Sequence, residues 1–149
     1  MNPHPYLRAY LAGVFVTTLI LPIILTAFIV IRLVLQVPVP IERGLVFPMA
    51  LVPACWGLWN MLWLASHKAT HLAVGIHGAA LPFLLLPVGA TFAHCYGILA
   101  FNATAVTWFN ACSIPYALLA AGFCCGVAAY YLVWKYIVGF LNRTLGIAS

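Results

Sequence analysis

Four long apolar runs decide what this chain can fold into. The first, residues 11–31, holds 21 residues without a charged side chain, between Arg8 and Arg32. About 20 such residues are enough for a helix to cross the roughly 30 Å hydrocarbon core of a bilayer. Only 5% of all residues are charged, whereas a soluble domain carries about 25%. We therefore predict an integral membrane protein.

The predicted fold is an all-α membrane protein with four transmembrane helices, made of a single domain over residues 1–149. The predicted spans are approximately 9–35, 44–66, 71–101 and 106–141. Short loops make consecutive helices antiparallel neighbours, so we expect an up-down four-helix bundle. The first run is expected to be a retained span, because no convincing small-residue cleavage site follows it.

Every predicted span contains proline. A proline inside a helix removes a backbone donor and frees a carbonyl, so we expect kinked helices. Two adjacent spans hold two prolines each, which leaves open a second interpretation, namely broken helices whose carbonyls bind a solute as in some transporters. Ordinary kinked packing is the simpler interpretation, since proline is tolerated in membrane helices. The prolines are Pro22, Pro48, Pro53, Pro82, Pro87 and Pro115.

The cations predict an orientation. The formal net charge is +5, but six scattered Lys and Arg residues do not form a nucleic-acid patch, and no nucleic acid is expected as a partner. Short cytoplasmic loops carry an excess of Lys and Arg. An N-terminus inside would place four cations in the cytoplasm and two outside, so we expect an inner-membrane protein with both termini inside. The four are Arg8, Lys68, Lys135 and Arg143, and the two are Arg32 and Arg43.

The chain has a single carboxylate side chain, Glu42, which lies outside the apolar runs. Paired-carboxylate hydrolysis, a Mg²⁺ site and a Ser-His-Asp triad all need acids that are missing here. Proton relay through intramembrane Asp or Glu is excluded for the same reason. The five cysteines form no Cys-x-x-Cys motif, so thiol-disulfide chemistry has no support. We expect no catalytic residue and lean against an enzyme.

A polar and aromatic stripe on the second span is the first candidate site. Trp56, Asn60, Trp63 and His67 follow one another at spacings of 4, 3 and 4 residues, which places them along one side of a helix. One interpretation is the wall of a pocket that opens toward the cytoplasm. The other is an interfacial aromatic belt with one interhelical amide hydrogen bond. Asn60 needs a partner, which a carbonyl freed near Pro82 or Pro87, the His77 ring or a bound ligand could provide; we expect His77 on the third helix, because it returns to about the same depth.

The histidines raise the question of a cofactor. His77 and His94 are separated by about 25 Å of helical rise, near opposite edges of the hydrocarbon. A haem near either one would need a second histidine on another span, and the sequence offers none, so hydrogen-bonded interface histidines are favoured over haem ligands. His67 and His71 supply two ligands where a zinc site needs three or four, so we expect no metal site.

The fourth span carries a small-xxx-small motif, Gly122 and Gly126. Small side chains let helix backbones approach closely, which favours helix association in lipid. We expect this face to pack within the bundle or against a partner.

Three classes of function remain. We favour a non-catalytic structural or accessory subunit, or an assembly factor, of a larger membrane complex. The reason is that transport paths usually concentrate intramembrane polar groups, whereas here they are few and scattered. Its expected partners are the lipid bilayer and other membrane subunits or further copies of the chain. The alternatives are a small oligomeric channel or carrier for a small solute, and a haem- or quinone-binding electron-transfer subunit. No cofactor is expected, with haem left open.

Overall fold

The computed structural model describes residues 4–36, 47–110 and 112–147. The chain is mostly helical (78%), and the prediction of four helices long and apolar enough to cross a membrane is confirmed. The start of the second predicted span, residues 44–46, and the loop with Glu42 and Arg43 lie outside the described residues. The helices are α1 (Pro5–Leu33), α2 (Phe47–Thr70), α3 (Val74–Cys95) and α4 (Tyr116–Val133), the last continued by the π-helical turn η2 (Trp134–Val138) and by α5 (Gly139–Thr144).

A small antiparallel sheet separates α3 from α4 where the sequence predicted helix. Its strands are β1 (Leu99–Phe101), β2 (Ala105–Trp108) and β3 (Cys112–Pro115), in the order β1-β2-β3. The third span, predicted to reach residue 101, ends as a helix at residue 95, and the fourth begins at 116 rather than 106. Backbone with positive φ explains the change, because a residue in that conformation interrupts a right-handed helix. Such residues are Gly97, Phe109 and Asn110.

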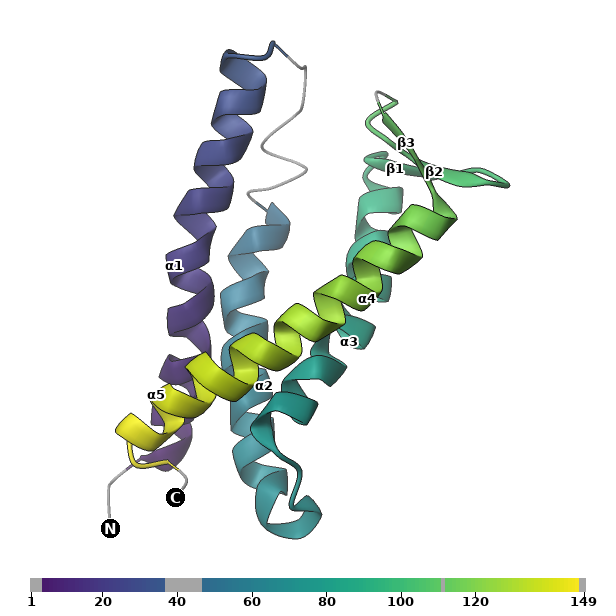
Figure 1. Cartoon of the computed structure of the whole chain (residues 1–149). Coiled ribbons are helices and arrows are strands. Elements are labelled where there is room, and N and C mark those ends of the chain that lie inside the picture. The colour runs from purple at the N-terminus through teal and green to yellow at the C-terminus, as the bar shows by residue number, and fades with distance from the viewer. Residues whose placement is uncertain (1–3, 37–46, 111, 148–149) are drawn as a thin grey trace.

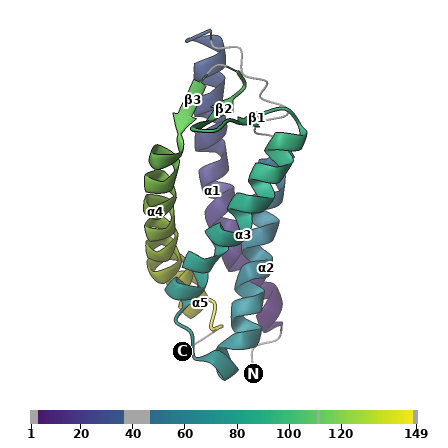
Figure 2. The same ribbon diagram turned by 90° about the vertical axis from the view of Figure 1, so that its right-hand side faces the viewer.

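The helices lie as two pairs. α1 packs along α2, and α3 packs along α4, with fewer contacts between α2 and α3. The two pairs meet where η2 and α5 reach α1 and α3, at the end of the molecule that holds both termini (Figures 1 and 2). Toward the sheet, α1 and α4 diverge (Figure 1). Packing is therefore concentrated at one end of the molecule.

Burial divides the fold into two parts. We call residues 5–17, 56–70, 74–82 and 134–144 the closed half; among the residues whose burial the structure describes, they contain every buried residue of the helices. We call the described residues of 18–36, 49–55 and 83–133 the open half; their only buried residues are Ile98 and Val106, at the sheet. The core is formed by Val16, Trp56, Leu81, Trp134 and Val138.

Close helix contacts in the closed half depend on glycine. A Cβ at Gly13 of α1 would overlap the backbone of Trp56 on α2, and a Cβ at Gly78 of α3 would overlap the Trp134 ring. Lipid-exposed helices gain little from burying apolar side chains, so close backbone approach supplies much of their attraction. These two glycines therefore hold α1 on α2 and α3 on η2.

Candidate functional site

Two buried amides form the most polar cluster of the closed half. Asn60 of α2 donates to Oδ1 of Asn142 at 2.8 Å, and Asn142 of α5 donates back to Oδ1 of Asn60 at 3.1 Å. Asn60 Nδ2 also donates to the Ala9 carbonyl of α1 at 2.8 Å. The exposed fractions of Asn60 and Asn142 are 0% and 1%, so neither amide has access to water. The pair ties three helices together.

The expected hydrogen bond between Asn60 and His77 does not form, because Asn142 offers Asn60 both a donor and an acceptor. A carboxamide is satisfied in full only by a group that can do both. His77 instead pairs with Trp59, one residue before Asn60. Trp59 Nε1 donates to the His77 carbonyl at 2.8 Å, and His77 Nε2 donates to the Trp59 carbonyl at 3.1 Å. The rings stack with centroids 4.8 Å apart, so α2 and α3 do meet at His77.

Trp63 and His67, the part of the predicted stripe nearest the end of α2, bond to the connector between α2 and α3. Trp63 Nε1 donates to the Leu72 carbonyl at 3.0 Å, and His67 Nδ1 donates to the same oxygen at 3.3 Å. The two rings lie 4.7 Å apart. Trp63 is buried, whereas His67 is half-buried. Both residues hold the connector against α2.

The upper end of the stripe packs on η2. Trp56 lies 5.3 Å from Trp134 and 5.1 Å from Tyr130, measured between ring centroids. Both indole N–H groups are buried without a well-aligned hydrogen-bond partner. A buried polar group of this kind usually bonds to an ordered water.

Three of the sequence candidates lie in the open half. His94 is exposed near the end of α3, and its Nδ1 donates to the Leu99 carbonyl at 3.0 Å. An added Cβ at Gly122 or Gly126 of α4 would meet no atom within 4 Å, so these glycines make no close contact with the described part of the chain. Of the two packing arrangements expected for these glycines, the one inside the chain is not found among the described residues. Packing against a partner stays a prediction.

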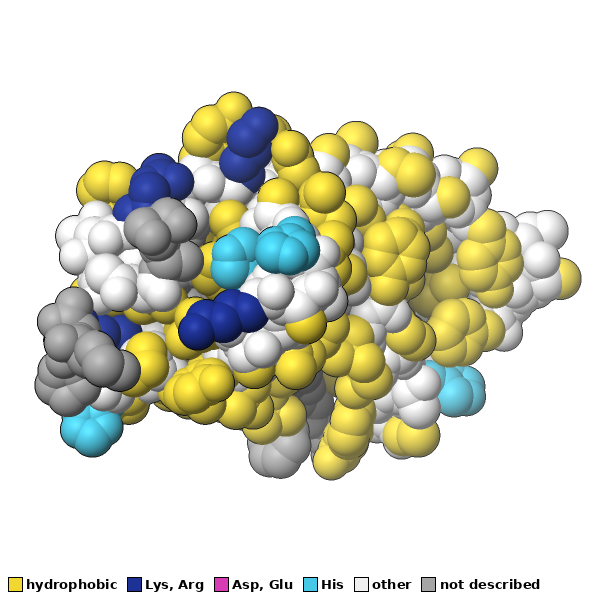
Figure 3. Space-filling view, turned by 90° about the horizontal axis from the view of Figure 1, so that it is seen from below, with side chains coloured by type: hydrophobic (Ala, Val, Ile, Leu, Met, Phe, Trp, Pro, Cys, Tyr) yellow, Lys and Arg dark blue, Asp and Glu magenta, His cyan; other side chains and the backbone are white. Residues whose placement is uncertain are grey.

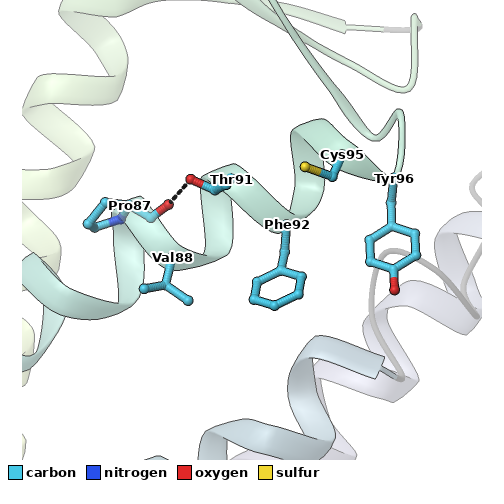
Figure 4. Close-up of a pocket in the computed structure, with 6 residues that line it drawn as sticks. All are labelled: Pro87, Val88, Thr91, Phe92, Cys95 and Tyr96. Atoms are coloured by element: carbon cyan, nitrogen blue, oxygen red, sulfur yellow. Dashed lines mark hydrogen bonds between the residues drawn. The ribbon is translucent and has the colours of Figure 1, made fainter.

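A shallow apolar cavity of about 490 Å³ also lies in the open half. In Figure 4, the side chains of Val88, Phe92 and Tyr96 project from α3 toward the same side. The Thr91 hydroxyl donates to the Pro87 carbonyl at 2.8 Å, within the same helix. The cavity wall formed by α3 therefore carries little polar function. Its lining residues are Pro87, Val88, Thr91, Phe92, Cys95 and Tyr96.

Comparison with protein-family models, with curated proteins and with solved structures finds no match.

The histidine geometry bears on the haem alternative. Haem iron needs the lone pair of a ring nitrogen. In His77, Nε2 donates to a carbonyl, which leaves only the lone pair of Nδ1 for a ligand. In His94, Nδ1 is the donor, which leaves the Nε2 lone pair for a ligand. Among the residues that the structure describes, no three His, Cys, Asp or Glu side chains come together to hold a metal ion.

Sequence reasoning missed two residues of the closed half, Asn142 and Trp134. Asn142 falls one residue beyond the predicted fourth span, yet it carries the signal that would have found it. An amide inside an apolar helix needs a partner that both donates and accepts, and other Asn or Gln side chains are the first candidates. Trp134 follows the same logic of spacing, because Trp134, Val138 and Asn142 recur every four residues and all are buried.

Proposed function

We propose that this chain is a non-catalytic membrane subunit, acting as a structural or accessory part, or an assembly factor, of a larger membrane complex. The observation that carries the proposal is α4. None of its residues is buried, although η2 and α5, which continue it, bury Trp134, Val138, Gly139 and Asn142. A helix that packs so lightly within its own chain offers a long surface to another helix.

The small residues of α4 support a protein partner on that surface. Gly122 and Gly126 are one helical turn apart, and both have space for a second backbone to approach. Interfaces between membrane helices are enriched in such residues, because close approach increases van der Waals contact and brings polar backbone groups together. The expected partner is a transmembrane helix of another subunit, and further copies of the chain would join it only as members of the same complex.

The polar side chains support the absence of catalysis. Asn60, Asn142, Trp59 and His77 bond to one another or to backbone carbonyls, and these bonds join helices. A catalytic or transport group in a membrane usually faces a cavity or a path instead. This use of polar groups is typical of a structural role.

The proposal includes the finer features of the fold and its placement. We propose an antiparallel up-down bundle with proline-kinked helices, in the cytoplasmic membrane, with both termini inside. Prolines occur inside α1, α2 and α3. The end of the molecule that holds the termini also holds four cations, and Arg32 lies at the opposite end of α1. This distribution fits the excess of Lys and Arg on the cytoplasmic side of membrane proteins.

The test combines association with a matched control. The double variant Gly122→Ile/Gly126→Ile should lose its partner on purification in mild detergent, because the added side chains prevent close approach. Gly89→Ile in α3 is the control, since a Cβ at Gly89 also meets nothing within 4 Å. Native mass spectrometry reads the partner, and thermal unfolding should be similar for both variants. Equal association of the wild-type chain and the double variant would contradict this use of α4.

The same measurement separates the alternatives. A different protein bound to the chain supports the subunit proposal. A symmetric homo-oligomer without a second protein would instead support the small channel or carrier. A haem absorption band would support the electron-transfer subunit, with His94 as the candidate ligand. The spectrum is recorded on the same sample.

A further inference from the structure

The end of the molecule that holds both termini collects positive charge from four separate segments. Arg8 lies in the second turn of α1, Lys68 near the end of α2, Lys135 in η2 and Arg143 in α5. We call these four residues the cationic face. In Figure 3, which views this end, dark-blue Lys and Arg side chains and cyan His side chains are spread over the surface. The only acidic side chain of the chain, Glu42, is not among the described residues, so the described part of this end carries no compensating carboxylate.

Contacts fix these cations at the same end although they are far apart in sequence. Arg8 Nη1 donates to the Leu145 carbonyl at 3.2 Å, which joins the start of α1 to the end of α5. A Cβ added to Gly75, in the first turn of α3, would lie 3.0 Å from Lys135 Cβ. Lys135 therefore sits beside the connector that follows Lys68. The cationic face is a consequence of the fold.

Lys135 is the most informative member of the face. Its ammonium lies 5.4 Å from the centre of the Tyr131 ring and 5.3 Å from that of Tyr136. Tyr136 is 61% exposed, and Phe140, four residues further along the helix, is exposed as well. A positive charge thus stands at the border of an exposed apolar and aromatic surface, as expected for a residue at a membrane interface.

We propose that the cationic face binds the phosphate headgroups of anionic phospholipids. A phospholipid matches both parts of the surface, since its phosphate faces Lys135 while an acyl chain covers the exposed rings of Tyr136 and Phe140. An acidic protein segment would match the charges alone and would leave the adjoining apolar surface to be covered by something else. Basic residues close to a membrane surface attract anionic lipids, and the attraction weakens as salt screens it.

The experiment measures lipid retention by the whole chain. The protein is reconstituted in nanodiscs of phosphatidylcholine with phosphatidylglycerol, released into neutral detergent, and the retained lipids are counted by native mass spectrometry. We expect enrichment of phosphatidylglycerol that falls as salt is raised. Lys135→Gln should weaken this preference about fivefold, and Lys135→Arg should keep it. Arg32→Gln, which removes one charge at the other end of α1, is the matched control.

The outcomes divide clearly. If Lys135→Gln unfolds, Lys68→Gln at the exposed end of α2 and the salt series on the unchanged protein still test the proposal. Equal retention of phosphatidylglycerol and phosphatidylcholine by the unchanged protein would overturn it, as would an equal loss in Arg32→Gln. An acidic protein that is bound by the unchanged chain and lost from Lys135→Gln, without lipid enrichment, would also overturn it and would assign the face to a protein partner.

Discussion

Both the closed half and the open half are made mostly of apolar residues, yet they pack very differently. In the closed half, Asn60 and Asn142 bond across helices, and Gly13 and Gly78 receive neighbouring helices at short distance. In the open half, the hydroxyls of Thr26 and Thr91 bond to carbonyls four residues earlier in their own helices. Glycines of the open half meet nothing. Its helices are linked instead by aromatic edges such as Phe83 against Phe123.

This difference shows what holds helices together in lipid. Burying a leucine against another helix gains little when the alternative is an equally apolar acyl chain, so hydrophobicity alone does not order the bundle. Interhelical hydrogen bonds and close backbone contact distinguish one helix arrangement from another. The closed half has both, and the open half has neither among its described residues. We infer that the closed half defines the fold and that the open half is available for partners.

The largest effect is expected at Gly13. Gly13→Ala places a methyl group against the carbonyl of Trp56 and the Cα of Gly57, both of them backbone atoms that cannot rotate away. Overpacking of this kind costs typically 1–3 kcal/mol, occasionally more, and we expect about 3 kcal/mol in unfolding measured in detergent micelles. Gly89→Ala in the open half is the control and should be close to neutral. Similar losses for both variants would remove the distinction between the halves.

A smaller loss of stability is expected from replacing Asn60 or Asn142. The double variant measures the energetic coupling between these two residues. Asn60→Leu and Asn142→Leu should each cost about 1–3 kcal/mol, because each leaves a buried amide unpaired. The double variant should cost less than the sum of the two, with a coupling of roughly 0.6–2 kcal/mol.

The control is a second double-mutant cycle, in which Asn60→Leu is combined with His77→Leu instead of Asn142→Leu. Asn60→Leu and His77→Leu remove hydrogen bonds that have no residue in common, so their effects on the free energy of unfolding should be nearly additive. Coupling as large as that between the two amides would mean that Asn60 and His77 act as one network, contrary to the geometry.

The sequence predicts some features of the closed half and not others. The four spans could be predicted because length and hydropathy are local properties. The spacing of Trp56, Asn60 and Trp63 also gives their common side, and all three are buried. The partner of Asn60 could not be predicted, since it depends on how α5 crosses α2. A π-helical turn at residues 134–138, which precedes α5, was not foreseen either.

The sheet shows a second limit. Residues 97–115 are apolar and aromatic, and a short apolar run suits a helix and a strand alike when only periodicity is used. Val106, Thr107 and Ile114 are β-branched, which favours strands. The predicted spans, which end at residue 101 and start again at residue 106, nevertheless include most of this segment as helix. The sequence also could not predict that no described helix packs on Gly122 and Gly126, because a small-xxx-small motif does not specify which helix approaches it.

The smallest effect is expected in the open half, at Thr91. Thr91→Val removes a hydroxyl that bonds only to the Pro87 carbonyl of its own helix, a bond that joins no second element. The side chains have nearly the same shape, and the site is exposed to lipid, where valine is at least as well accommodated as threonine. We expect a change in the free energy of unfolding below about 0.5 kcal/mol, as for surface substitutions generally. Thr17→Val is the counterpart in the closed half, because the Thr17 hydroxyl also bonds within its own helix, to Val14 at 2.9 Å, but is buried. Similar changes in the free energy of unfolding for the two variants would show that a hydroxyl bonded within its own helix contributes little in either half. The difference in stability between the halves would then come from the hydrogen bonds between helices. A large loss at Thr91 would place a structural contact in the open half and break the comparison.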